Sequence, residues 1–301
     1  MAEGNMVNGT ADAGKQKAKA PVPKKNSGKR PKLGQNFLID RTYAEKIIAA
    51  LGDISQKRVI EIGAGQGVLT DLLIRRAGRV ISIELDRVLS AQLRMRYATQ
   101  TNVEVLEGDI LKIDFAHVLG PRPGALAGVT PRAPEPVSVV GNIPYYITSD
   151  ILLRLFQFHR FFDTIVLMVQ KEVADRIAAA PGSRDYGLLS ATAQVYARVE
   201  NVLTVPPGAF NPPPKVYSSV LRLTVAPRLE KLGVAEREFI DFLKLSFGQK
   251  RKTLVNNLKS EYDTKAIQAA LKKAGVRADA RAETLPLEKA AAVYKLLVAG
   301  S

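Results

Sequence analysis

The sequence contains no cysteine and only two histidines, His117 and His159, among its 301 residues. Without cysteine the chain has no disulfide, no thiolate metal site and no thiol nucleophile. Two histidines are too few for a metal site built from imidazole ligands, so we expect no metal centre. No stretch of about 20 apolar residues is present to span a bilayer, and no apolar segment has the form of a secretory signal. We therefore expect a cytoplasmic chain without membrane association.

Acidic residues are scarce relative to basic ones. The 44 Lys and Arg against 29 Asp and Glu give a formal charge of +15 and a pI of about 9.9. Such a surplus suits a polyanionic partner, although a solvated basic surface is the plainer alternative and charge alone does not distinguish RNA from DNA or an acidic membrane. Much of the charge precedes residue 33, where lysines recur without apolar periodicity. We expect 1–32 to form a disordered basic tail.

Short apolar runs alternate with helical patterns along the rest of the chain, which is typical of an α/β protein. With 46% hydrophobic residues, the chain can fill one α/β core and a smaller appended domain. The pattern becomes helical from about residue 228, so we divide the chain into 1–32, 33–227 and a helical domain at 228–301. Buried strands are expected at 58–62, 80–83, 103–106, 137–140 and 164–169, with a closing pair at 200–205 and 216–225. Helices are expected at 43–51, from about 68, and at 170–176, 188–196, 264–274 and 287–298.

A glycine turn follows the first of these strands, with the spacing G-x-G-x-G from Gly63 to Gly67. That spacing differs from the G-x-G-x-x-G of dinucleotide binders and favours a nucleoside-like cofactor. Glu84 ends the next strand, 21 residues after Gly63, where an acid can bind both ribose hydroxyls, and Asp109 follows the third strand, where it can accept from an adenine amine. Either acid alone would more often be a helix cap. Together, the order of these residues points to S-adenosylmethionine.

The tetrapeptide Asn142-Ile143-Pro144-Tyr145 follows the apolar run at 137–140, where a buried strand would end. It suits the presentation of a base's exocyclic amine to an electrophile, because Asn142 offers an acceptor oxygen. Pro144 lacks an N–H and biases the residue before it toward an extended conformation, which can direct a main-chain carbonyl into the site as a second acceptor. The Tyr145 ring can stack on a base that has been flipped out of its helix, and such stacking contributes roughly 1–3 kcal/mol per base. An ordinary Asn-x-Pro turn is the plainer alternative.

Phe210 lies between Gly208 and a run of three prolines, in a segment that we expect to be a loop. A large apolar side chain exposed there would favour a binding role, and the prolines would stiffen the loop and lower the entropy lost on clamping a base. The alternative is that Phe210 fills a small satellite core.

Several segments together resemble the ribosomal RNA adenine dimethyltransferases of the KsgA type, and they occur in that family's order from about residue 32 to the C-terminal helices. The segments are Leu33-Gly34-Gln35-Asn36-Phe37-Leu38, Glu61-Ile62-Gly63-Ala64-Gly65, Ile83-Glu84-Leu85-Asp86, Gly141-Asn142-Ile143-Pro144-Tyr145-Tyr146, Pro206-Pro207-Gly208-Ala209-Phe210 and Pro212-Pro213-Pro214-Lys215-Val216. The resemblance implies a Rossmann-like S-adenosylmethionine-dependent methyltransferase fold with a small all-helical C-terminal domain. Asp150 and Tyr217 depart from the family's usual residues, frequently Pro and Asp.

The resemblance also implies roles for individual residues. Tyr145 and Phe210 would sandwich the target adenine, and Asn142 would face its amine. The cofactor pocket would be lined by Asn36, Leu38, Gly63, Glu84, Asp109 and Asn142. Lys250, Arg251 and Lys252, which we expect on a helix, can meet phosphates of the RNA, although a solvated helix face is an equal alternative. The proline-rich segment at 120–136 looks like an insertion that the fold merely tolerates.

The implied reaction is N6,N6-dimethylation of two adjacent adenosines in a hairpin near the 3′ end of small-subunit (16S) ribosomal RNA, linked to subunit biogenesis. The partner would be an immature small ribosomal subunit, and we expect a monomer. One alternative is a related methylase that acts on large-subunit RNA and confers antibiotic resistance. Another is a non-catalytic ribosome assembly factor, which the intact set of Gly63, Glu84, Asp109 and Asn142 disfavours. A nicotinamide dehydrogenase is disfavoured by the glycine spacing.

Overall fold

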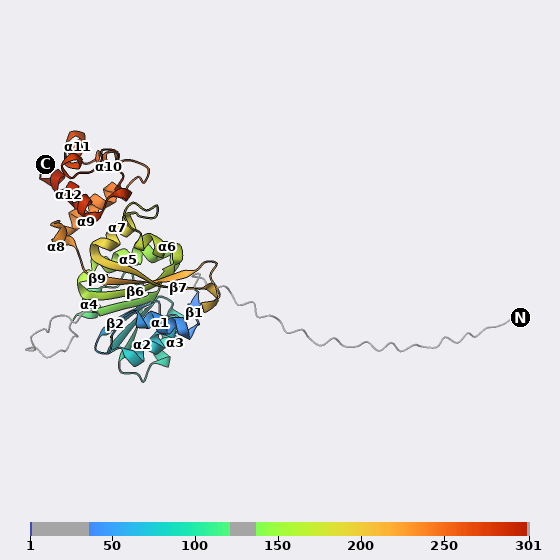
Figure 1. Cartoon of the computed structure of the whole chain (residues 1–301). Helices are drawn as coiled ribbons and strands as arrows, with labels where there is room; N and C mark the ends of the chain where they lie inside the picture. The colour runs from blue at the N-terminus through green and yellow to red at the C-terminus, as the bar shows by residue number, and fades with distance from the viewer. Residues whose placement is uncertain (2–35, 121–136, 300–301) are drawn as a thin grey trace, which may run out of the picture. The chain divides into compact units, whose positions relative to one another are not determined.

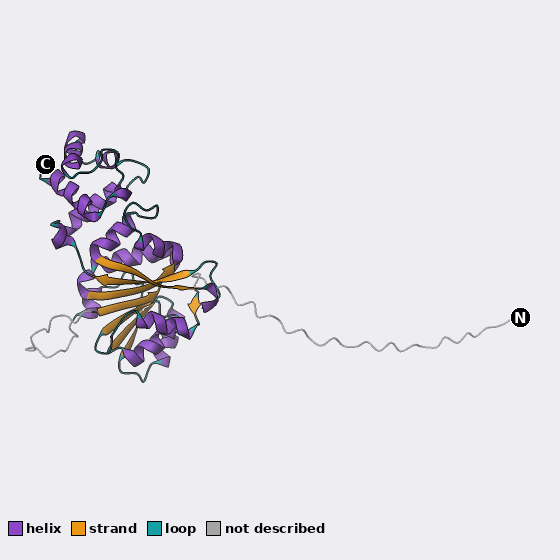
Figure 2. Cartoon of the chain, viewed as in Figure 1, coloured by secondary structure: helices purple, strands orange, loops and turns teal. Residues whose placement is uncertain are grey.

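The computed structural model describes Met1, residues 36–120 and residues 137–299. The expected basic tail beyond Met1 and the proline-rich segment after Gly120 lie outside the described residues, as does the side chain of Tyr145. The centre of the fold is a seven-stranded sheet with the strand order β4-β3-β2-β5-β6-β9-β7 (Figures 1 and 2). Its strands are β2 (Arg58–Ile62), β3 (Arg79–Glu84), β4 (Val103–Glu107), β5 (Val137–Asn142), β6 (Phe162–Gln170), β7 (Ala197–Val205) and β9 (Ser218–Val225).

The sheet is parallel from β4 to β6, and β9 runs antiparallel between β6 and β7. The chain builds β2, β3 and β4 outward in one direction and then returns to place β5 on the other side of β2. Ile62, the last residue of β2, therefore lies between Ile83 of β3 and Gly141 of β5. In an open α/β sheet, the carboxyl ends of the strands at such a reversal form the usual ligand site.

Both faces of the sheet are buried, which explains why its strands are continuous apolar runs in the sequence. Successive side chains of β2 point to opposite faces, so Val59 and Ile60 belong to separate apolar clusters. Helices α1 (Arg41–Ala49) and α2 (Val68–Arg76) cover the face of Val59, and α3 (Arg87–Arg96) lies on the same side (Figure 1). The other face is covered by α5 (Thr148–Gln157), α6 (Lys171–Ala178) and α7 (Leu188–Tyr196). The predicted α/β architecture is confirmed.

Helices α1 and α3 begin where the sequence supplies an aspartate cap. Asp40 accepts from the backbone N–H groups of Thr42 and Tyr43, and Asp86 accepts in the same way at the start of α3. The other short helices that precede residue 228 are α4 (Phe115–Leu119), η1 (Tyr145–Ile147), η2 (His159–Phe161) and η3 (Pro207–Ala209), and a separate pair of short strands consists of β1 (Phe37–Leu38) and β8 (Phe210–Asn211). Among the described residues, no helix is long and apolar enough to cross a membrane.

The C-terminal segment is helical, as the sequence predicts. It contains α8 (Leu229–Leu232), α9 (Glu236–Ser246), α10 (Leu254–Leu258), α11 (Thr264–Lys273), η4 (Ala282–Thr284) and α12 (Leu287–Val298). The rings of Phe239 and Phe242 pack against Tyr294 with centroids 5.6 and 5.4 Å away. This apolar cluster continues into the cluster on the face of the sheet that α5, α6 and α7 cover. Tyr196 of α7 also donates to Glu236 Oε1 at 2.8 Å. The boundary at residue 228 stays a prediction.

Candidate active site

The glycine turn occupies the carboxyl end of β2, at the reversal point of the sheet. Gly65 has a φ of +57°, a left-handed conformation that L side chains rarely adopt. A Cβ on Gly65 would also lie 3.1 Å from the Phe37 ring, so this part of the turn is packed closely. Gly63, with a φ of +71°, donates its N–H to Ile83 O at 2.8 Å, which fixes the turn to the end of β3. Because Gly63 has no side chain, a ligand can approach the main chain of the turn closely at this residue.

Glu84 ends β3 beside this turn, as the sequence predicts. It is 2% exposed, with Oε2 accepting from Gly65 N and Oε1 from Asp86 N, both at 2.8 Å. A carboxylate offers about four acceptor positions, so the two that remain suit a pair of neighbouring hydroxyls. Glu84 therefore fits the ribose of a nucleoside cofactor and at the same time holds Gly65 in place.

Asp109 lies two residues beyond β4, at the same edge of the sheet. The residue before it, Gly108, donates its N–H to Glu84 O at 2.9 Å, which ties this loop to the end of β3. Asp109 Oδ1 accepts from Leu111 N at 3.0 Å, and its side chain is 31% exposed. One oxygen thus caps a turn, which was the plainer alternative for this residue, while the carboxylate retains acceptor positions for an amine.

Asn142 ends β5 on the opposite side of β2, next to the glycine turn. A Cβ on Gly63 would lie 3.5 Å from Asn142 O, which measures how near the two strand ends are. The side chain donates through Nδ2 to Asn36 O at 3.1 Å. This donation turns the amide nitrogen toward the segment at residue 36, and so directs the amide oxygen the other way. The structure therefore brings together Asn36, Gly63 and Asn142, which the sequence separates by up to 106 positions.

Pro144 and η1 follow Asn142. Pro144 has the extended angles φ −57° and ψ 130°, and its carbonyl accepts from Ile147 N at 3.2 Å and from Thr148 Oγ1 at 3.4 Å. The backbone of Tyr145 begins η1, whereas its side chain lies outside what is described. Stacking on Tyr145 stays a prediction.

Phe210 differs from the expectation of an exposed residue in a loop. It lies in β8 (Phe210–Asn211), which pairs antiparallel with β1 (Phe37–Leu38), and it is 3% exposed. Leu38, its partner in register, is 4% exposed, and both side chains belong to the apolar cluster on the α1 and α2 face. The prediction of exposure was wrong because β1, from the far end of the sequence, pairs with this segment and covers it.

Lys250, Arg251 and Lys252 also differ from the prediction. All three are exposed, but they lie in the connection between α9 and α10 rather than on a helix, because α9 ends at Ser246. Lys250 Nζ donates to Arg184 O at 3.0 Å. Lys252 also lines an open hollow of about 610 Å³ together with Lys244, Lys259, Asn256 and Asn257. An RNA-binding role for the three residues stays a prediction.

Comparison with known proteins decides the family. The family model described as Ribosomal RNA adenine dimethylase matches residues 26–298. The chain belongs to the ribosomal RNA adenine dimethylase family. The Ribosomal RNA small subunit methyltransferase A of Koribacter versatilis is 57% identical over 278 residues, covering 92% of this chain and 98% of that protein. The protein of the same name from Acidobacterium capsulatum is 51% identical over 273 residues, covering 90% and 92%.

Solved structures agree with this membership. A dimethyladenosine transferase from Plasmodium falciparum aligns with a TM-score of 0.70 at 26% identity, covering 85% of this chain and 95% of that one. The 23S rRNA methyltransferase ErmE aligns with a TM-score of 0.64 at 28% identity, covering 87% and 100%. The chain is thus an adenine dimethylase by family, with the Rossmann-like fold that its motifs imply. Among residues 36–120 and 137–299, no group of three His, Cys, Asp or Glu could hold a metal ion.

Two features of this dimethylase were not anticipated from its sequence. Glu61 on β2 is 1% exposed and accepts from Thr70 Oγ1 and Ser82 Oγ, both at 2.6 Å, and burial raises its pKa to about 7. A second network joins Arg96 and Tyr97 to the glycine turn and to Asp71 of α2. Both depend on contacts between strands and helices that no local pattern indicates.

Proposed function

We propose that this chain transfers methyl groups to the N6 amines of two adjacent adenosines in a hairpin near the 3′ end of small-subunit (16S) ribosomal RNA. It would act in the cytoplasm, as a monomer, on an immature small subunit. The observation that carries the proposal is the placement of Asn142, which ends β5 beside the glycine turn of β2 with its amide oriented by Asn36. The names of the relatives that match nearly the whole chain support the choice of RNA.

S-adenosylmethionine is the proposed cofactor, and when bound it supplies a methyl group on an electrophilic sulfonium. Glu84 would hold the ribose hydroxyls, and Asp109 would accept from the adenine amine. Gly63 would allow close approach of the backbone, with Leu38 of β1 and Asn36, the residue before β1, closing the pocket. The two free acceptor positions of the buried Glu84 support this assignment.

The target amine is a weak nucleophile because its lone pair is delocalised into the base. The oxygen of Asn142 would accept one of its N–H groups and aim the nitrogen's lone pair at the methyl carbon. Since charge moves from sulfur to nitrogen during transfer, alignment carries much of the rate advantage and no strong base is needed. Tyr145 would stack on the base. Phe210 would complete the sandwich only when its ring, 3% exposed here, becomes uncovered on binding RNA.

Lys250, Arg251 and Lys252 are proposed to bind RNA phosphates, which a triple substitution by glutamine tests. We expect the variant to bind RNA more weakly at low salt. The slope of the logarithm of the binding constant against the logarithm of the salt concentration should become shallower by about 0.7 to 0.9 for each phosphate that the variant no longer neutralises. The measurement is a titration of labelled RNA at several salt concentrations. The matched control replaces three exposed lysines of α11, Lys265, Lys272 and Lys273, by glutamine. Equal weakening by both triple variants would show only the effect of net charge and would contradict this site.

Parallel labelling separates the proposed function from its alternatives. The chain is incubated with methyl-labelled S-adenosylmethionine and, in separate reactions, immature small subunits, large subunits or naked RNA, and the labelled nucleosides are identified. We expect N6,N6-dimethyladenosine from small subunits alone. Label in large-subunit RNA would instead support the resistance methylase, and binding without label would support an assembly factor. Either result contradicts the proposal.

A further inference from the structure

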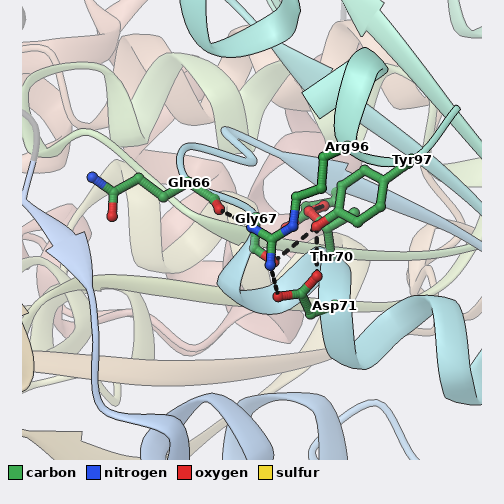
Figure 3. A network of polar contacts seen from close by, with 7 residues as sticks. Gln66, Gly67, Thr70, Asp71, Arg96 and Tyr97 are labelled. Carbon is green, nitrogen blue, oxygen red and sulfur yellow. Dashed lines mark hydrogen bonds and ion pairs between the residues drawn. The ribbon is translucent and has the colours of Figure 1, made fainter. Parts of the chain in front are cut away.

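The end of α3 is joined to the glycine turn by a set of polar contacts (Figure 3). Arg96, the last residue of α3, donates through Nη1 to Gln66 O at 3.0 Å and through Nη2 to Asp71 Oδ2 at 2.5 Å. Tyr97, the next residue, donates to Asp71 Oδ1 at 2.8 Å, and its hydroxyl lies 3.3 Å from Gly67 O. Two consecutive side chains thus contact two peptide carbonyls of the turn and the first turn of α2.

The Tyr97 side chain is held in one position by burial, packing and hydrogen bonding. It is 7% exposed and packs with Ala64 of the glycine turn and Leu93 of α3. Burial and the hydrogen bond to Asp71 raise the pKa of the Tyr97 phenol, so the hydroxyl stays protonated and remains a donor. The Arg96 guanidinium lies 5.5 Å from the centre of the Tyr97 ring, which adds a cation–π contact.

Gly67 shows how closely the Tyr97 side chain approaches the turn. Its φ is +85°, and a Cβ at this position would lie 2.5 Å from the Tyr97 hydroxyl. Glycine is therefore required both by the backbone conformation and by the tyrosine that rests against it. Displacing the Arg96 guanidinium would remove its contact with Gln66 O, and displacing Tyr97 would remove its contact with Gly67 O. The backbone hydrogen bonds from Gly67 N to Ala64 O and from Asp71 N to Gly67 O, both at 2.9 Å, would remain, so the turn would loosen rather than unfold.

The opposite side of α2 is held independently. Thr70, the neighbour of Asp71, donates to the buried Glu61 of β2 at 2.6 Å, so the first turn of α2 is fixed both to the sheet and to α3. Glu84 also contacts the glycine turn, through Gly65 N. The turn is thus constrained at Gly65 by a residue assigned to the cofactor and at Gln66 and Gly67 by residues that have no assigned role.

We propose that Arg96 and Tyr97 are positioning residues for S-adenosylmethionine, which set cofactor affinity by holding the glycine turn in its binding conformation. The inference rests on the proposed cofactor role of this turn. Neither residue has to touch the cofactor, because each acts through the carbonyls of Gln66 and Gly67 and through Asp71. Their effect is confined to the turn, so RNA binding and the chemical step at saturation do not depend on them.

The test uses the full-length variants Arg96→Gln and Tyr97→Phe. Affinity for S-adenosylhomocysteine is measured by calorimetry without RNA, and KM for S-adenosylmethionine and kcat are measured with saturating RNA. We expect the dissociation constant and this KM to rise about tenfold, the size expected for losing a hydrogen bond to a charged group, with kcat within about twofold of wild type. Arg96→Lys, which keeps the charge opposite Asp71, should recover part of the affinity.

The matched control is Arg79→Gln. It breaks the Arg79–Glu104 ion pair, also 2.5 Å long, at the opposite end of β3 from the glycine turn. The melting temperatures of Arg79→Gln and Arg96→Gln are measured as well. We expect Arg79→Gln to keep its cofactor affinity even if both variants lose the same amount of thermal stability. Unchanged affinity in both Arg96→Gln and Tyr97→Phe, or a loss confined to kcat, would overturn the inference. If the wild type itself bound no S-adenosylhomocysteine, the proposed cofactor would fail first and the inference with it.

Discussion

Replacing Asn142 by alanine is expected to lower methyl transfer at least about a hundredfold while leaving RNA affinity unchanged, in line with the loss of one positioned hydrogen-bond partner of a transition state. The substitution removes the amide oxygen proposed to accept from the target amine. It also removes the donor to Asn36 O, at 3.1 Å, but it leaves the backbone pairing of β5 intact. The expected loss therefore lies in kcat rather than in the affinity for RNA.

Single-turnover methylation and RNA titration, measured on the same preparation, check this expectation. Asn201→Ala is the matched control, because Asn201 is an exposed asparagine within β7 and has no role in the proposed site. The control should retain wild-type turnover. Turnover of Asn142→Ala within a few fold of wild type would remove Asn142 from the mechanism, and a parallel loss of RNA affinity would reassign it to binding.

Glu61→Gln is expected to change how stability depends on pH. Burial raises the pKa of Glu61 from 4.5 to about 7, so between these values the folded chain holds a proton that the unfolded chain releases. Stability contributed by this group is complete below about pH 4.5, falls as the pH rises toward 7 and is lost above it. At about 1.36 kcal/mol per pH unit, the full difference is about 3 kcal/mol.

The glutamine variant is neutral at every pH and matches the protonated carboxyl in shape. We therefore expect it to equal the wild type near pH 4.5 and to be more stable, by up to about 3 kcal/mol, at pH 8. Urea unfolding across this range measures the difference. Glu104→Gln, at an exposed glutamate paired with Arg79, should change stability by less than about 1 kcal/mol. A Glu61→Gln difference that stays constant with pH would contradict protonation of the buried carboxyl.

The sequence predicted those parts of the fold that depend on local pattern. The strand at 58–62 and the helix beginning at Val68 are confirmed, because apolar runs and glycine spacing determine them directly. The clustering of Gly63, Glu84, Asp109 and Asn142 at one edge of the sheet follows from parallel strand order, and the structure has them there. Their chemical roles stay predictions.

Features that depend on distant pairing were not predictable in this way. Phe210 is buried because residues 37–38 pair with residues 210–211, and no local signal indicates that pairing. Likewise, Arg96 and Tyr97 form an ordinary helix end until the fold brings Gln66, Gly67 and Asp71 against them. The connection holding Lys250 was taken as helix because Leu254 and Leu258 beyond it continue the apolar pattern of α9, although that helix ends at Ser246.

A crystal structure of the chain with bound S-adenosylhomocysteine tests the account most directly. The account predicts the ribose hydroxyls on Glu84, the adenine amine near Asp109 and the sulfur facing the amide oxygen of Asn142. A ligand bound away from the glycine turn, or a sulfur turned from Asn142, would contradict it.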